Sequence, residues 1–172
     1  GTHTECIGHI TDKRVSILSS LKLDLVPSTV ISITPSGTNE TYIPPINPED
    51  LVITKSDLEL QLKDVNCDFL EGLIIRTLPN SSSKKNIDYM NNPSCFFSIE
   101  AMEYVVSLGV RHLLVDTPSV DRLFDDGYLS AHNIFWETKD KEFNSRTQNK
   151  TITEMIFVDE SIQNGSYLLN IQ

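Results

Sequence analysis

Two imidazoles and a carboxylate lie within seven residues near the start of the chain. Residues 1–9 read GTHTECIGH, which places His3, Glu5 and His9 close together in the sequence. Imidazole nitrogens and carboxylate oxygens are ligands of divalent transition metals. The glycines at positions 1 and 8 predict a tight turn that aims the three side chains at one point. This segment is therefore predicted to form half of a metal site.

Two further candidate ligands lie far along the chain. His132 and Glu154 each occupy a mostly uncharged stretch at the boundary of an expected element. With the first three residues they would make a centre for one or two ions, and hydrolysis there needs a coordination position left for water. The alternative interpretations are structural: His132 as a capping or partly buried residue, and Glu154 as an exposed strand residue. His112, which follows an arginine in an expected strand, is interpreted as structural.

The hydrophobic pattern predicts the elements that position these residues. The continuous apolar run at 72–77 is typical of a strand covered on both faces. Ser98 as the N-cap and Gly109 as the stop delimit a helix. The order strand, helix, strand indicates an α/β fold, a mixed sheet with flanking helices, in one domain over residues 1–172. The expected strands are 14–18, 30–34, 51–53, 72–77, 110–115, 152–156 and 167–171, and the expected helices are 56–65, 98–109 and a short one from Ser130.

Three segments between these elements are expected to be irregular. Residues 116–121, DTPSVD, follow the strand 110–115, where open α/β sheets usually place their working loops. Residues 80–92 are rich in Ser, Lys and Asn and predict a surface loop. Residues 136–150 predict a polar insertion.

The composition argues against several classes of partner. A total of 24 acidic and 14 basic residues gives a formal charge of −10, which would repel nucleic acid. No apolar run approaches the ~20 residues that cross a bilayer, so we expect no membrane partner and a cytoplasmic location. Cysteines at positions 6, 67 and 95 fit neither a disulfide framework nor a zinc knuckle, which favours a reducing compartment.

Residues 1–9 resemble the H-x-G-T-H-x-D-x-P-x-H signature of the cyclase-like metal-dependent hydrolases, the family of bacterial kynurenine formamidase and isatin hydrolase. Later segments resemble the family's further motifs in the same order, over nearly the whole chain. The resemblance implies the swivelling β/β/α fold of this family. The later segments are 73–77 (LIIRT), 97–101 (FSIEA), 108–110 (LGV), 116–121 (DTPSVD), 131–132 (AH) and 152–154 (ITE).

This resemblance also implies a role for each candidate residue. His3, Glu5, His132 and Glu154 match metal ligands, with Glu5 bridging two ions in two-metal members, and His9 matches the proton donor and acceptor. The expected cofactor is one or two divalent ions, Zn²⁺ first and Mn²⁺ as the alternative. The implied activity is arylformamidase-like hydrolysis of a small amide, formamide or lactam by a metal-activated water. A homodimer or higher homo-oligomer is implied by the resemblance alone.

The sequence departs from the signature at three positions. The first histidine of the signature would precede Gly1, so we expect an N-terminal segment to be missing from this chain. Glu5 replaces the usual Asp, which lengthens the ligand by one methylene, and Ile7 replaces a Pro that would stiffen the turn. Two other interpretations therefore stay open: a catalytically silent member that binds metal or ligand, and a metal-free structural interaction domain.

Overall fold

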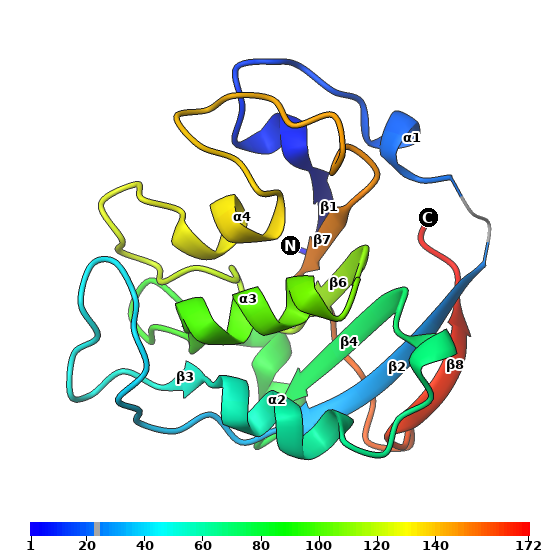
Figure 1. Cartoon of the computed structure of the whole chain (residues 1–172). Helices are drawn as coiled ribbons and strands as arrows, with labels where there is room; N and C mark the ends of the chain where they lie inside the picture. Colours follow the sequence, from blue (N-terminus) through cyan, green and yellow to red (C-terminus); the bar gives the residue numbers. More distant parts are fainter. Residues whose placement is uncertain (23–24) are drawn as a thin grey trace.

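A computed structural model describes residues 1–22 and 25–172. In this part of the chain, six strands form one mixed sheet in the order β1-β7-β6-β4-β2-β8 (Figure 1). The four inner strands are parallel to one another, whereas β1 and β8 run antiparallel at the two edges. The strands are β1 (His3–Cys6), β2 (Val26–Ile33), β4 (Gly72–Thr77), β6 (His112–Val115), β7 (Thr151–Glu154) and β8 (Gly165–Leu169).

Helices cover one face of this sheet. In Figure 1, α3 lies in front of the inner strands, with α2 and α4 on either side of it. The helices are α1 (Ile17–Ser20), α2 (Lys55–Leu62), α3 (Ile99–Ser107) and α4 (Ser130–Phe135). A small parallel pair consists of β3 (Val52–Ile53) and β5 (Phe96–Phe97), and short 3₁₀ helices form at η1 (Ile7–His9), η2 (Cys67–Phe69) and η3 (Ser82–Asn86).

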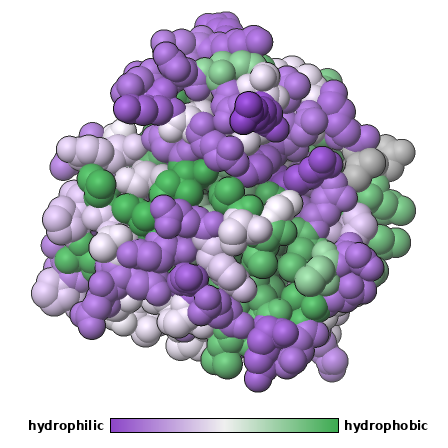
Figure 2. All heavy atoms as spheres, in the orientation of Figure 1, coloured by the Kyte–Doolittle hydropathy of each residue, from purple (hydrophilic) through white to green (hydrophobic). Residues whose placement is uncertain are grey.

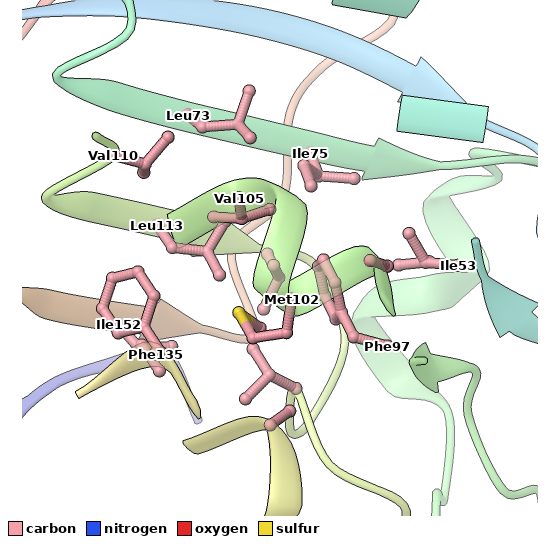
Figure 3. Close-up of a cluster of buried hydrophobic side chains, with 14 of the residues drawn as sticks. Ile53, Leu73, Ile75, Phe97, Met102, Val105, Val110, Leu113, Phe135 and Ile152 are labelled. Carbon is pink, nitrogen blue, oxygen red and sulfur yellow. The ribbon is translucent and has the colours of Figure 1, made fainter. Parts of the chain in front are cut away.

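The main hydrophobic core lies between α3 and the sheet. Side chains alternate along a strand, so Leu73 and Ile75 of β4 point toward the helix, where Met102 and Val105 of α3 meet them (Figure 3). All six residues of β4 are buried, as the continuous apolar run predicts. The core therefore fixes the inner strands, at whose carboxyl ends the loops emerge.

The surface around this core is mostly hydrophilic on the face shown. Figure 2 shows hydrophilic residues over most of the upper part, with apolar residues gathered in the centre and at the lower right. Within residues 1–22 and 25–172, no helix combines the length and the apolar character that crossing a bilayer requires.

The α/β prediction with a mixed sheet and flanking helices is confirmed, but one local prediction is wrong and another holds only in part. Residues 14–18 do not form a strand: Ile17–Ser20 is a helix, and the Ser16 side chain caps it by accepting a hydrogen bond from the Leu18 amide. The tight turn predicted within residues 1–9 is present only at η1, which contains Gly8, whereas the preceding residues His3–Cys6 form the strand β1. In both segments the local pattern is too short to specify the structure, and neighbouring elements decide it.

Candidate metal centre

Strands β1 and β7 bring the first two candidate ligands beside Glu154. The strands pair antiparallel, with His3 opposite Glu154 and Glu5 opposite Ile152. Alternate residues of a strand share a face, so His3, Glu5 and Glu154 all point to the side that α4 covers. His3 Nε2 lies 3.5 Å from Glu154 Oε2.

The turn η1 folds His9 back onto Glu5. His9 Nε2 lies 3.2 Å from Glu5 Oε2. Gly8 permits this turn because a Cβ at position 8 would lie 2.8 Å from the backbone nitrogen of Val15. A glycine is therefore required at position 8, because two backbone segments approach each other too closely to leave room for a side chain.

Helix α4 supplies His132 from the other side. His132 Nε2 lies 2.7 Å from Glu5 Oε1 and 3.6 Å from Glu154 Oε1. The ring also packs against the buried ring of Trp136, with 5.6 Å between their centroids. The predicted polar insertion 136–150 thus begins with a fully buried residue that contacts the site.

All five candidate residues converge. Their ligand atoms form two groups, Glu5-His9-His132 and His3-Glu5-Glu154, each with its atoms within 4.8 Å of one another, and Glu5 belongs to both. The side chains of Glu5, His132 and Glu154 are buried, whereas those of His3 and His9 are 49% and 53% exposed. A ligand in solution would therefore reach the cluster from the side on which the two exposed imidazoles lie.

The buried groups perturb one another electrostatically. Burial and the charge of Glu5 raise the pKa of Glu154 to about 7, although His132 and the Val120 amide oppose this effect. Burial alone would lower the pKa of His132, but its hydrogen bonds to Asp121 and Glu5 outweigh burial and raise that pKa to about 10. Two neighbouring carboxylates in a buried site are an excess of negative charge that a divalent cation would neutralise. The donor set therefore fits a metal ion.

Both structural interpretations of the distal residues differ from what the fold shows. Glu154 is 4% exposed and is not an exposed strand residue. His132 is 2% exposed and lies in the first turn of α4, where its backbone amide donates to Asp121. His112 is buried on β6 with its Nδ1 2.8 Å from Thr151 Oγ1, outside both groups of ligand atoms.

Sequence reasoning missed the residues that support the cluster. Asp121 accepts a hydrogen bond from His132 Nδ1, and the Val120 amide donates to Glu154 Oε1. Both belong to residues 116–121, DTPSVD, and the position of this segment after a buried strand is the sequence feature that could have indicated their role. Tyr42, which donates to Asp121, lies in a proline-rich connector, and nothing in the sequence of that connector indicates a role at the site.

The family profile described as "Putative cyclase" matches residues 1–122. The chain belongs to this cyclase family. The family inferred from residues 1–9 and the later motifs is thereby confirmed. The matched region contains His3, Glu5 and His9 and ends before His132 and Glu154, so the distal half of the cluster is placed by the fold.

Two solved structures share the cyclase fold seen here. One is described as "The Structure Of Potential Metal-Dependent Hydrolase With Cyclase Activity", with 18% sequence identity and a TM-score of 0.60. The other is described as "The structure of predicted metal-dependent hydrolase from Bacillus stearothermophilus", with 17% identity and a TM-score of 0.56. The alignments cover 97% of this chain but only 66% and 65% of those chains. Comparison with curated proteins gave no match.

Proposed function

We propose that this member of the cyclase family is a metal-dependent hydrolase that cleaves a small amide, formamide or lactam. The observation that carries the proposal is the shared position of Glu5, whose carboxylate belongs to both groups of ligand atoms. Three buried carboxylates surround the His132 ring, so even a protonated ring leaves an excess of negative charge that is costly to bury without a further cation. They are the carboxylates of Glu5, Asp121 and Glu154. The residues of this arrangement come from four separate elements, β1, η1, α4 and β7.

The proposed ligands divide into a buried and an exposed set. Glu5, His132 and Glu154 would hold the ion from inside, and His3 from the solvent side. A divalent ion in this position supplies a Lewis acid for a carbonyl oxygen and lowers the pKa of water. Imidazole and carboxylate donors suit Zn²⁺ first, with Mn²⁺ as the alternative.

His9 is the residue proposed to move protons. Its side chain is 53% exposed, it approaches Glu5 to 3.2 Å, and its ring lies beside that of His132 with 5.9 Å between the centroids. Histidine exchanges protons near neutral pH, and the exposed ring can reach both the substrate and solvent. In this role His9 accepts the proton of the attacking water and passes it to the leaving nitrogen, while Glu5 orients the ring.

The proposed substrate is a small molecule. A cavity of about 270 Å³ is bounded partly by Thr2 and Met155, the sequence neighbours of His3 and Glu154. None of the five candidate residues lines this cavity, so the choice of a small substrate rests on the family resemblance. The resemblance of residues 1–9 to the kynurenine formamidase and isatin hydrolase family selects formamides and lactams as the first compounds to test.

The experiment begins with metal content. The purified chain is stripped with a chelator and reconstituted with Zn²⁺ or Mn²⁺, and bound metal is measured by elemental analysis. Hydrolysis of N-formylkynurenine and isatin is then followed by absorbance. Stoichiometric metal and turnover support the proposal. Metal without turnover indicates the silent-site alternative, and absence of bound metal indicates a metal-free interaction domain.

His9→Ala separates the proposed roles of ligand and proton carrier. We expect this variant to lose at least about 100-fold in kcat, the usual contribution of a general acid-base group, while retaining its metal. His112→Gln is the matched control, because it removes an imidazole that contacts Thr151 rather than the cluster. Loss of metal in His9→Ala would make His9 a ligand and contradict its assignment as proton carrier.

A further inference from the structure

The carboxylate of Asp121 is fully occupied by four hydrogen-bond donors. Its Oδ1 accepts from the Tyr42 hydroxyl at 2.6 Å and from the Ala131 amide at 2.6 Å. Its Oδ2 accepts from the His132 amide at 3.2 Å and from His132 Nδ1 at 2.5 Å. Asp121 is 3% exposed, so water does not compete for these contacts. The carboxylate is therefore fixed in one orientation.

We propose that Asp121 and Tyr42 are positioning residues that hold the His132 ring with its proton on Nδ1 and its Nε2 directed at Glu5. This inference rests on the proposed function, because it concerns how a metal ligand of that site is oriented. An imidazole binds metal through an unprotonated nitrogen, and a carboxylate on the other nitrogen fixes which one is free. The 2.7 Å distance from Nε2 to Glu5 Oε1 shows the direction in which the ring is held.

Tyr42 reaches the cluster through Asp121, and its hydroxyl also lies 3.5 Å from Asp125 Oδ2. Its hydroxyl donates to Asp121 and accepts a hydrogen bond from the Arg122 amide at 3.1 Å. Its ring packs on Phe96, with 4.7 Å between the centroids. Burial, reinforced by the charge of Asp121, raises the pKa of Tyr42 far above neutral, so the hydroxyl remains a donor. Tyr42 thus prevents the carboxylate from rotating away from His132.

The loop that carries Asp121 also supports the second buried ligand. The amide of Val120 donates to Glu154 Oε1 at 3.0 Å. The start of the loop is fixed because Asp116 accepts from the Thr77 amide at 2.8 Å and from Lys84 Nζ at 2.7 Å. Residues 116–121 therefore form one support, anchored at the end of β4, that positions His132 and Glu154 together.

Asp121→Asn tests this inference with little change of shape. An asparagine has one acceptor oxygen, so one side of its amide must present N–H groups to donors that the carboxylate satisfied. We expect its zinc affinity, measured against a chromophoric chelator, to fall about 10- to 100-fold, as when such supporting contacts are lost. Tyr42→Phe removes one hydroxyl and keeps the ring contact with Phe96, and we expect a loss of about fivefold.

Asp125→Asn is the matched control. Asp125 is also buried, accepts from the Leu129 amide at 2.6 Å and lies 3.5 Å from the Tyr42 hydroxyl, but its hydrogen bonds do not reach His132. The zinc affinity of the Asp125→Asn variant should stay close to that of the wild type. An equal loss in Asp125→Asn would overturn the inference, because it would trace the effect to the turn before α4. Unchanged affinity in both Asp121→Asn and Tyr42→Phe would overturn it as well.

Proton NMR of the metal-free protein separates this inference from the proposed function. The His132 Nδ1 proton, identified by its absence in His132→Gln, should give a slowly exchanging downfield signal. That signal should vanish or shift in Asp121→Asn and persist in Asp125→Asn. If the wild type binds no zinc, the proposed function fails while this signal still tests the positioning. If the signal is unchanged in Asp121→Asn, the positioning fails whatever the metal content.

Discussion

Zinc affinity should rise steeply with pH, because protons compete for two of the proposed ligands. Burial opposes protonation of His132, but its contacts with Asp121 and Glu5 prevail and raise its pKa to about 10. Burial and the charge of Glu5 raise the pKa of Glu154 to about 7. Each group must lose its proton before zinc can bind there, so metal binding releases protons at every pH below these values.

The slope follows from the number of protons released. Glu154 is about half ionised at pH 7 and almost fully ionised at pH 9, whereas His132 is still mostly protonated, so above about pH 8 binding releases mainly the His132 proton and the affinity rises about tenfold per pH unit. Below pH 7 the Glu154 proton adds to the effect, and the slope steepens. A histidine with the ordinary pKa of about 6.5 would instead leave the affinity nearly flat above pH 7.

The assay is competition with a chromophoric chelator from pH 7 to 9 at constant ionic strength, corrected for the chelator's own protonation. Calorimetry in buffers with different ionisation enthalpies counts the released protons independently. His132→Gln is the control, since it should bind zinc more weakly and lose the slope. A wild-type affinity that stays constant over this range would refute the reasoning, because it would mean that His132 is already unprotonated at neutral pH.

Two further substitutions test how the site and the sheet are built. Glu5→Asp shortens a side chain whose carboxylate lies 2.7 Å from His132 and 3.2 Å from His9, so zinc affinity should fall by about tenfold or more. Tighter binding would show that the aspartate of the family signature suits this site better. Gly72→Ala would place a Cβ 2.0 Å from Ser28 Oγ, so urea unfolding should show a loss of about 1–3 kcal/mol. Gly37→Ala, with no atom within 4 Å, is the control and should leave stability unchanged.

The central elements of the fold were predictable because their signals are local. Residues 72–77 are continuously apolar, and the strand they form is buried on both faces. Ser98 caps α3 by accepting a hydrogen bond from the Ala101 amide, as its position before an apolar helical run predicts. The strand predicted at 14–18 was wrong because β-branched residues favour a strand only where a neighbouring strand pairs with it. Leu18 is 81% exposed and lies outside the sheet.

The candidate site was predictable only in part, for the same reason. His3 and Glu5 are two residues apart, so any strand through them puts both side chains on one face. His132 and Glu154 were inferred from family resemblance, because no local pattern indicates that α4 and β7 meet beside β1. Tyr42 and Asp121 lie 79 residues apart, and only the folded chain reveals their hydrogen bond.

The cyclase family match ends at residue 122, immediately after the segment that supports the distal ligands. Asp121 lies inside the matched region and binds His132 beyond it, and Val120 does the same for Glu154. Residues 116–121 thus connect the part of the chain that identifies the family to the part that completes the cluster. Since one rigid loop orients both buried ligands, a substitution that shifts this loop should weaken them together, whereas a substitution at His3 or His9 should act on one group of ligand atoms alone.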